Sequence, residues 1–184
     1  MKSNPAFIVD GFTEKNIIDK ICPNRPIRRT DLNGKDVSLD AIANRLASYI
    51  RLFSNRYYPI IVIIDKESRS QSCDEIVSYI MDKLYNLGFN NQDIRISIAD
   101  KMIENWLIAD LRLFSPKLPP PKNIDGINGA SQLRKIFGSY SKSTDCIKIL
   151  DDFCPEVAYK NSSSFKSFID SIENIDCEFT KFKR

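Results

Sequence analysis

The sequence predicts an α/β fold, in which a parallel sheet is flanked by helices and followed by a small helical C-terminal extension. Three short apolar runs, rich in β-branched residues, predict buried parallel strands over residues 5–10, 60–65 and 93–98. Segments with helical spacing separate these runs, as in chains that build parallel sheets. A carboxylate lies at the end of each run. Because ligands of open α/β sheets lie beyond the carboxyl ends of the strands, we expect the three acids to meet at one rim.

Local signals place the remaining elements of the first two thirds of the chain. Ser38 is the expected N-cap of a helix with a continuous apolar stripe, and Gly88 is expected to end the helix that follows the central strand. An arginine-rich extended segment is expected near residues 27–32. Helical spacing of apolar residues predicts helices over residues 13–21, 38–53, 73–87 and 101–111.

The amino-acid composition of the chain changes after Phe114. Three consecutive prolines within residues 115–122 exclude a helix or a central strand and predict a linker or surface strap. Beyond it, short helices are expected over residues 129–137, 144–153 and 162–172, with a loose tail from Phe179. We therefore divide the chain into an α/β core over residues 1–114 and a strap with a helical extension, packed on that core, over residues 115–184.

Composition narrows the possible chemistry. The 184 residues are 42% hydrophobic, which is enough for one well-buried core. No histidine is present, so a Ser-His-Asp triad, a Cys-His dyad and an imidazole general base are excluded. Catalysis would have to use carboxylates, Lys, Tyr, Ser or a metal ion. The five cysteines are scattered without a Cys-x-x-Cys pair, which predicts reduced thiols and no zinc site.

Charge and hydropathy restrict the partners. No membrane-spanning or secretory segment is visible, so a cytoplasmic location without membrane contact is expected. The net charge of +3 is too small to hold nucleic acid by bulk field alone, although arginines such as Arg25, Arg28 and Arg29 allow a basic face. Acids gathered at one rim would suit a hard divalent cation.

Two motifs resemble the signatures of the TOPRIM fold. These are Ile8-Val9-Asp10-Gly11-x-Thr13-Glu14, an acid-Gly turn after the first strand, and Ile63-Ile64-Asp65-Lys66-Glu67, an acid-x-acid pair after a later strand. The segments Glu104-Asn105-Trp106-Leu107 and Ser162-Ser163-Ser164-Phe165 resemble a bacterial TOPRIM-like subfamily that is related to overcoming-lysogenization-defect nucleases and is often found with ATPase partners. The order of the motifs and their strand context carry the resemblance.

The resemblance implies a Mg²⁺ or Mn²⁺ site and cleavage of phosphodiester bonds. Asp65 and Glu67 are expected to hold the ion from the same side of an extended strand. Asp10 and Glu14 are expected to add metal binding or proton transfer, and Glu104 to complete the metal site. Arg69 with Lys66 is expected to receive phosphate, although Arg69 would equally offset nearby negative charge. An anti-phage effector or a toxin acting on DNA or RNA is the implied role.

Two features leave an alternative open. The family's first motif normally carries Glu before Gly, where Asp10 stands here, and a carboxylate misplaced by about an ångström can lower a rate roughly a hundredfold. The alternative is therefore a degraded binding module that docks on and regulates a partner ATPase. Asp10-Gly11 would then serve merely as a turn that caps the next helix. The sequence decides neither between DNA and RNA nor whether the protein forms a homo-oligomer.

Overall fold

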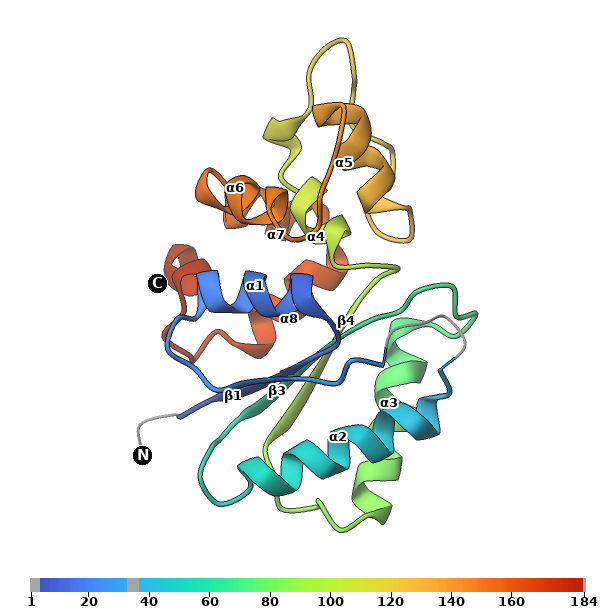
Figure 1. Ribbon diagram of the computed structural model, residues 1–184, viewed down its shortest axis with the longest axis vertical. Helices are drawn as coiled ribbons and strands as arrows, with labels where there is room; N and C mark the ends of the chain where they lie inside the picture. The colour runs from blue at the N-terminus through green and yellow to red at the C-terminus, as the bar shows by residue number, and fades with distance from the viewer. Residues whose placement is uncertain (1–3, 33–36, 184) are drawn as a thin grey trace.

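The computed structural model describes residues 4–32 and 37–183. Its centre is an all-parallel sheet in the order β2-β1-β3-β4, which confirms the predicted α/β class. The strands are β1 (Ala6–Val9), β2 (Ile27–Arg29), β3 (Ile60–Asp65) and β4 (Ile94–Ala99). Strand β3 has buried β-branched residues on both faces because helices cover both sides of the sheet (Figure 1).

The two faces of the sheet pack against different helices. Alternate residues such as Ile8, Val62 and Ile64 contact α2 (Leu39–Phe53) and α3 (Cys73–Asn86). The intervening residues, such as Phe7 and Ile63, face α1 (Phe12–Ile21) and the C-terminal helices. Ser38 caps α2 as predicted, accepting a hydrogen bond from the Ala41 amide at 3.2 Å.

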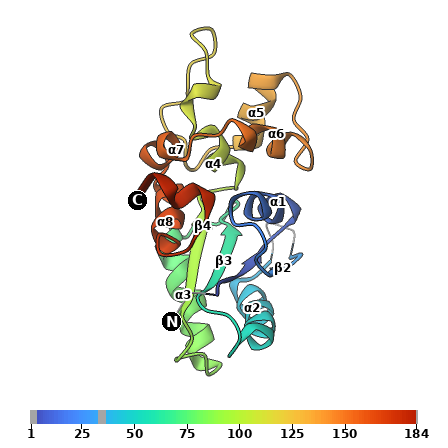
Figure 2. The same ribbon diagram turned by 90° about the vertical axis from the view of Figure 1, so that its left-hand side faces the viewer.

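The helices after the sheet lie beyond its carboxyl edge and along one face. They are α4 (Glu104–Ile108), η1 (Leu111–Leu113), α5 (Gly129–Phe137), α6 (Asp145–Asp151), α7 (Pro155–Asn161), α8 (Ser163–Ser171) and η2 (Glu178–Lys183). Figure 2 shows α4 to α7 stacked past the ends of β3 and β4. The extension therefore covers the rim where the acids of the sheet emerge.

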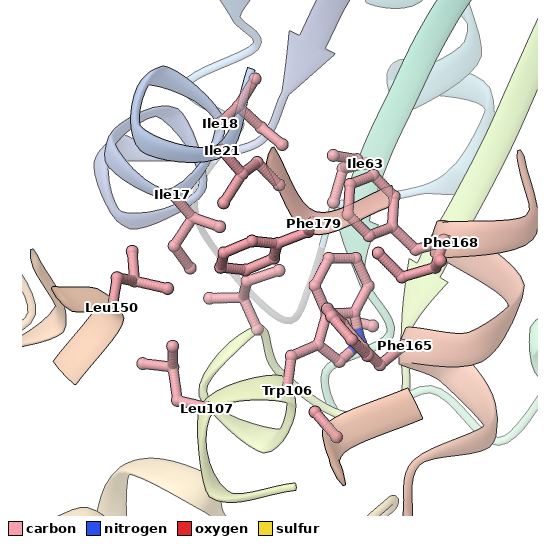
Figure 3. Close-up of a cluster of buried hydrophobic side chains, with 14 of the residues drawn as sticks. Ile17, Ile18, Ile21, Ile63, Trp106, Leu107, Leu150, Phe165, Phe168 and Phe179 are labelled. Atoms are coloured by element: carbon pink, nitrogen blue, oxygen red, sulfur yellow. The ribbon is translucent and has the colours of Figure 1, made fainter. Parts of the chain in front are cut away.

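An aromatic cluster joins this extension to the sheet. The Trp106 ring stacks on Phe168 with centroids 4.7 Å apart and meets Phe165 edge-on at 5.7 Å (Figure 3). Its indole nitrogen donates a hydrogen bond to Ser164 Oγ at 2.9 Å. Trp106 therefore fixes α4 against α8, and α4 carries one of the predicted site residues.

The structure differs from the sequence predictions in α4 and in a missed helix. The helix expected over residues 101–111 spans only Glu104–Ile108, because Lys101 has a φ of 78° and cannot be helical. Asp110 then accepts a hydrogen bond from the Arg112 amide and turns the chain into η1. Helix α7 was not predicted, although Pro155 is its first residue, where proline is favoured.

The C-terminal tail and one cysteine pair also differ from the prediction. The tail expected to be loose from Phe179 forms η2, and Phe179 is buried with its ring stacked on Phe153. Cys22 and Cys177, expected as thiols, form a disulfide that ties the end of α1 to this tail. Cys73, Cys146 and Cys154 are free, as expected. None of the described helices is long and apolar enough to cross a membrane.

Candidate functional site

A cavity of about 350 Å³ opens at the carboxyl ends of β1 and β3. It lies between the start of α1 and the loop that precedes α6. The residues that line it are Asp10, Gly11, Phe12, Thr13, Glu14, Asp65, Glu67, Lys142 and Ser143. Acids from two strand ends and one helix thus meet where the parallel topology predicts a ligand site.

Asp10 follows β1 and is held by its neighbour strand. Its Oδ1 accepts a hydrogen bond from Thr30 Oγ1 at 2.7 Å, and Thr30 is itself buried one residue after β2. The parallel pairing of Val9 with Arg29 brings Asp10 and Thr30 side by side. Burial raises the pKa of Asp10, and the Thr30 hydrogen bond partly offsets this effect.

Glu14 lies in the first turn of α1 and is turned inward. Its Oε2 accepts a hydrogen bond from the Gly11 amide at 2.9 Å, so the carboxylate caps its own helix. The residue is buried, with 6% of its surface exposed. Burial and the nearby charges of Asp10 and Glu104 raise the pKa of Glu14 to about 7.

Asp65 is the last residue of β3 and the centre of the acidic group. Its Oδ1 is buried and has no hydrogen-bond partner among the described residues. Burial raises the pKa of Asp65 well above its usual range, and the charges of Glu14, Glu104 and Asp10 raise it further. This carboxylate therefore lacks the compensation that a buried charge requires.

Glu104 comes to the same group from α4. It is fully buried, and neither of its carboxylate oxygens accepts a hydrogen bond of good geometry within the described residues. Its Oε1 lies 3.1 Å from Lys142 Nζ. Burial would lower the pKa of Lys142, but the charge of Glu104 raises it, so the ammonium form is favoured.

A close backbone contact sets the position of α4. A Cβ atom at Gly129 would lie 2.7 Å from the Glu104 carbonyl carbon and from the Asn105 amide nitrogen. The first residue of α5 thus packs directly on the first turn of α4. Only a residue without a Cβ permits this approach, which makes Gly129 part of the support of Glu104.

Sequence reasoning missed Lys142 and Gly129. Lys142 follows α5 in a loop of small polar residues, 38 positions after Glu104 (142 − 104), and no local pattern marks it. Gly129 was noted only as the start of a helix. Both act through contacts between segments that are distant in sequence, so a search along the chain could not have found them.

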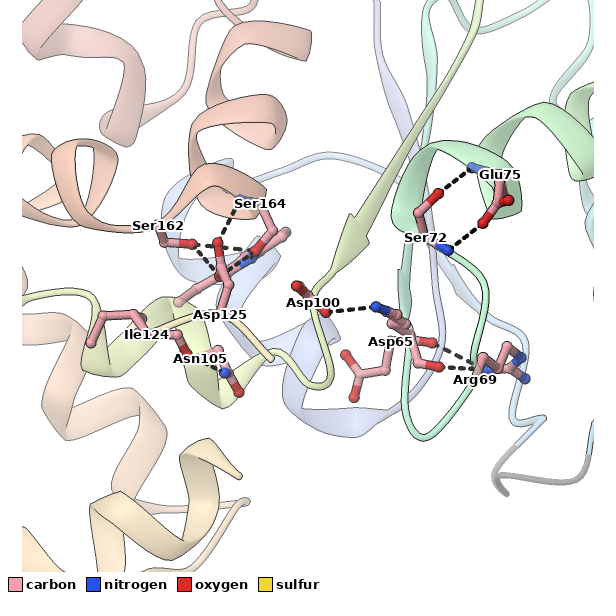
Figure 4. Close-up of polar contacts among 12 residues, drawn as sticks. Asp65, Arg69, Ser72, Glu75, Asp100, Asn105, Ile124, Asp125, Ser162 and Ser164 are labelled. Atoms are coloured by element: carbon pink, nitrogen blue, oxygen red, sulfur yellow. Dashed lines mark hydrogen bonds and ion pairs between the residues drawn. The ribbon is translucent and has the colours of Figure 1, made fainter. Parts of the chain in front are cut away.

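The remaining predicted residues have other partners. β3 ends at Asp65 and Glu67 has a φ of 56°, so the expected extended geometry stops before Glu67. Glu67 still lines the cavity, but its carboxylate lies 3.8 Å from the Arg69 guanidinium. Arg69 itself donates hydrogen bonds to the carbonyls of Asp65 and Lys66 (Figure 4) and to the carbonyl of Val37. Lys66 forms an ion pair with Asp100 at 3.3 Å.

These contacts give Lys66 and Arg69 partners within the protein itself. Arg69 holds the loop after β3 in place, and only 11% of its side chain is exposed. Lys66 balances an acid at the end of β4. The cation that faces the acidic cavity is instead Lys142, which is supplied by the extension.

The side chains of this acidic group are donors of the kind that a divalent cation prefers. Asp10, Glu14, Asp65 and Glu104 bring four carboxyl groups into electrostatic contact, with Lys142 as the nearby cation. These hard oxygen donors suit Mg²⁺ or Mn²⁺, and Asp65 Oδ1 and Glu104 Oε2 lack partners among the described residues. No three acids or cysteines of residues 4–32 and 37–183 are already arranged with metal-ligand spacing. The residues fit the ion by their chemistry, while their oxygens do not converge on one point.

No protein-family model, curated protein or solved structure matches this chain. The TOPRIM resemblance of the first two motifs therefore stays a prediction.

Proposed function

We propose that this protein is a TOPRIM-like nuclease that hydrolyses phosphodiester bonds with Mg²⁺ or Mn²⁺. The observation that carries the proposal is a group of acids at the carboxyl edge of a parallel sheet. Asp10, Glu14 and Asp65 line one cavity, and the charge of the buried Glu104 acts on Glu14 and Asp65. Asp10 follows β1, Glu14 lies in α1, Asp65 ends β3, and Glu104 begins α4. A capping role accounts for Glu14 but leaves the burial of Asp65 and Glu104 unexplained.

Separate residues of the site bind the metal, accept the proton and contact the phosphate. Asp65 and Glu104 would hold the cation, because Asp65 Oδ1 and Glu104 Oε2 are buried and lack hydrogen-bond partners in the described structure. When bound, the ion would neutralise phosphate charge and make a coordinated water more acidic. Glu14 is positioned at the cavity to take a proton from the attacking water. Lys142 supplies positive charge for a phosphate oxygen.

Asp10 serves this site from a fixed position. The hydrogen bond from Thr30 holds its carboxylate in one orientation. This contact supports a ligand role for Asp10 despite the shorter side chain, because a preorganised donor loses less freedom on binding. Glu67 stays at the cavity wall, where it is paired with Arg69.

A second candidate function rests on the spacing of the acids. Because no ligand set is preassembled among the described residues, the site also suits a degraded TOPRIM-like module that docks on a partner ATPase. An anti-phage or toxin role belongs to the nuclease candidate. The two candidates differ in whether the isolated protein cleaves nucleic acid.

The deciding experiment is cleavage of labelled plasmid, single-stranded DNA and total cellular RNA by the purified protein with Mn²⁺. We expect cleavage that requires the metal and is abolished by Asp65→Ala and Glu104→Gln. Asp82→Asn, at an exposed aspartate of α3, is the matched control and should retain full activity. Full activity of both site variants would refute the assignment. Absence of cleavage by the wild-type protein would favour the binding module.

A further inference from the structure

An aromatic side chain stands exposed at the edge of the acidic cavity. Phe12 lines the cavity together with Asp10 and Glu14, yet 54% of its surface is exposed. It is the first residue of α1 and lies between the two acids in sequence. Because residues two apart on a helix do not face each other, Glu14 turns inward while the Phe12 ring stays at the mouth.

A basic side chain from the edge of the sheet meets this ring. The Arg29 guanidinium lies 5.3 Å from the centroid of the Phe12 ring. Arg29 belongs to β2, the edge strand, and its Nε is 3.4 Å from Asp31 Oδ1. The cation–π contact keeps the Arg29 guanidinium beside the Phe12 ring, and the ion pair holds it next to Asp31.

Packing alone explains this arrangement poorly. The hydrophobic effect favours burial of a phenylalanine, and this one leaves more than half of its surface in solvent. A phosphodiester substrate, in contrast, carries a flat apolar base next to each phosphate. An exposed aromatic ring beside an arginine is what single-strand binding proteins use to stack a base and attract the backbone.

We propose that Phe12 and Arg29 form a stacking platform for an unpaired nucleobase next to the phosphate that the acidic cavity receives. This inference rests on the proposed nuclease function and deepens it, because it names single-stranded nucleic acid as the substrate class. In a duplex, each base is already stacked and paired, so reaching a ring two residues from Asp10 requires a base free to leave the stack.

The test measures affinity and steady-state cleavage on a single-stranded oligonucleotide and on a duplex of the same sequence, each as DNA and as RNA. We expect Phe12→Ala to weaken single-strand binding and raise KM by about tenfold or more, with a smaller effect on kcat. Phe12→Trp should retain or strengthen binding. Phe137→Ala is the matched control, since Phe137 is 49% exposed and lies on α5 outside this cavity.

The outcomes separate this proposal from the function on which it rests. Cleavage that needs Asp65 but has the same KM in wild-type protein and Phe12→Ala would overturn the platform alone. Equal losses on single strands and duplexes would also overturn it. If the wild-type protein neither binds nor cleaves nucleic acid, both proposals fail. Thermal melting of each variant checks the fold, which an exposed side chain should not affect.

Discussion

Lys142 Nζ lies 3.1 Å from Glu104 Oε1, and the two residues come from opposite sides of the proline-rich strap. Glu104 begins α4 directly after the sheet, whereas Lys142 belongs to the helical extension. The acidic cavity is thus completed by the extension, which supplies positive charge to a group of buried acids. Without the extension, the acidic cavity would lack the positive charge of Lys142.

Replacing Lys142 with methionine should reduce both activity and stability. The change leaves Glu104 buried without its ion-pair partner, but 59% of the Lys142 side chain is exposed, so solvent moderates the loss. We expect the free energy of unfolding, measured with urea at neutral pH, to fall by roughly 1–2 kcal/mol. Cleavage should fall about tenfold or more. Lys160→Met, at an exposed pair with Glu156, is the control and should leave stability nearly unchanged. Equal behaviour of the two variants would contradict this role.

Replacing Gly129 with alanine should displace α4. The added Cβ would lie 2.7 Å from backbone atoms of Glu104 and Asn105, which cannot rotate away as a side chain can. We expect a loss of roughly 1–3 kcal/mol in chemical denaturation, accompanied by reduced metal-dependent activity. Gln132→Ala on the same helix is the control, because it leaves this contact unchanged. A fully stable Gly129→Ala variant would show that α4 can shift freely.

Features that depend on neighbouring residues could be predicted from the sequence, and features that depend on distant contacts could not. The strand that ends at Asp65 could be predicted because a β-branched run needs no distant contact to be recognised. Asp10 and Asp65 could be placed near one rim because parallel strands end on the same side, whereas Asp100, the acid after β4, pairs with Lys66 and does not line the cavity. Lys142 and the Cys22–Cys177 bond could not, since their partners are far away along the chain. The phosphate contact expected of Arg69 and Lys66 stays a prediction, because their partners in the structure, loop carbonyls and Asp100, carry no signal in the sequence.

The stability of the metal-free protein should decrease as the pH rises through the range where Glu14 ionises. The folded pKa of Glu14 is about 7 against an ordinary value of 4.5, so the folded state binds more protons between these values. The free energy of unfolding therefore falls from pH 5 to pH 7.5, by on the order of 3 kcal/mol for this group. Glu14→Gln should flatten the profile, measured by urea unfolding in EDTA, whereas Asp82→Asn should not. A profile that rises over this range would show that Glu14 is not desolvated.

The Cys22–Cys177 disulfide should contribute strongly to stability. The two cysteines are 155 residues apart, and cross-linking so long a loop restricts the unfolded chain by roughly 4–5 kcal/mol in the chain-entropy model. We expect Cys22→Ser to lower the melting temperature as much as a reducing agent lowers that of the wild type. Cys73→Ser, at a free cysteine, is the control. Peptide mapping without reductant that finds both thiols free would refute the bond.

Replacing Asp65 with asparagine should stabilise the metal-free protein but abolish the stabilisation that a bound cation gives. Asp65 is a buried acid with an unpaired oxygen, so Asp65→Asn should raise the melting temperature of the metal-free protein at pH 7.5, because it removes an uncompensated charge.

The same variant should lose the stabilisation that Mn²⁺ gives the wild type. A cation at a hundred times its Kd stabilises a folded protein by about 2.7 kcal/mol, and NaCl at equal ionic strength controls for screening. When melting temperature is plotted against Mn²⁺ concentration, the curves of the wild type and of Asp65→Asn should therefore cross. A purely structural Asp65 would give parallel curves, since its replacement would change stability without changing the response to the ion.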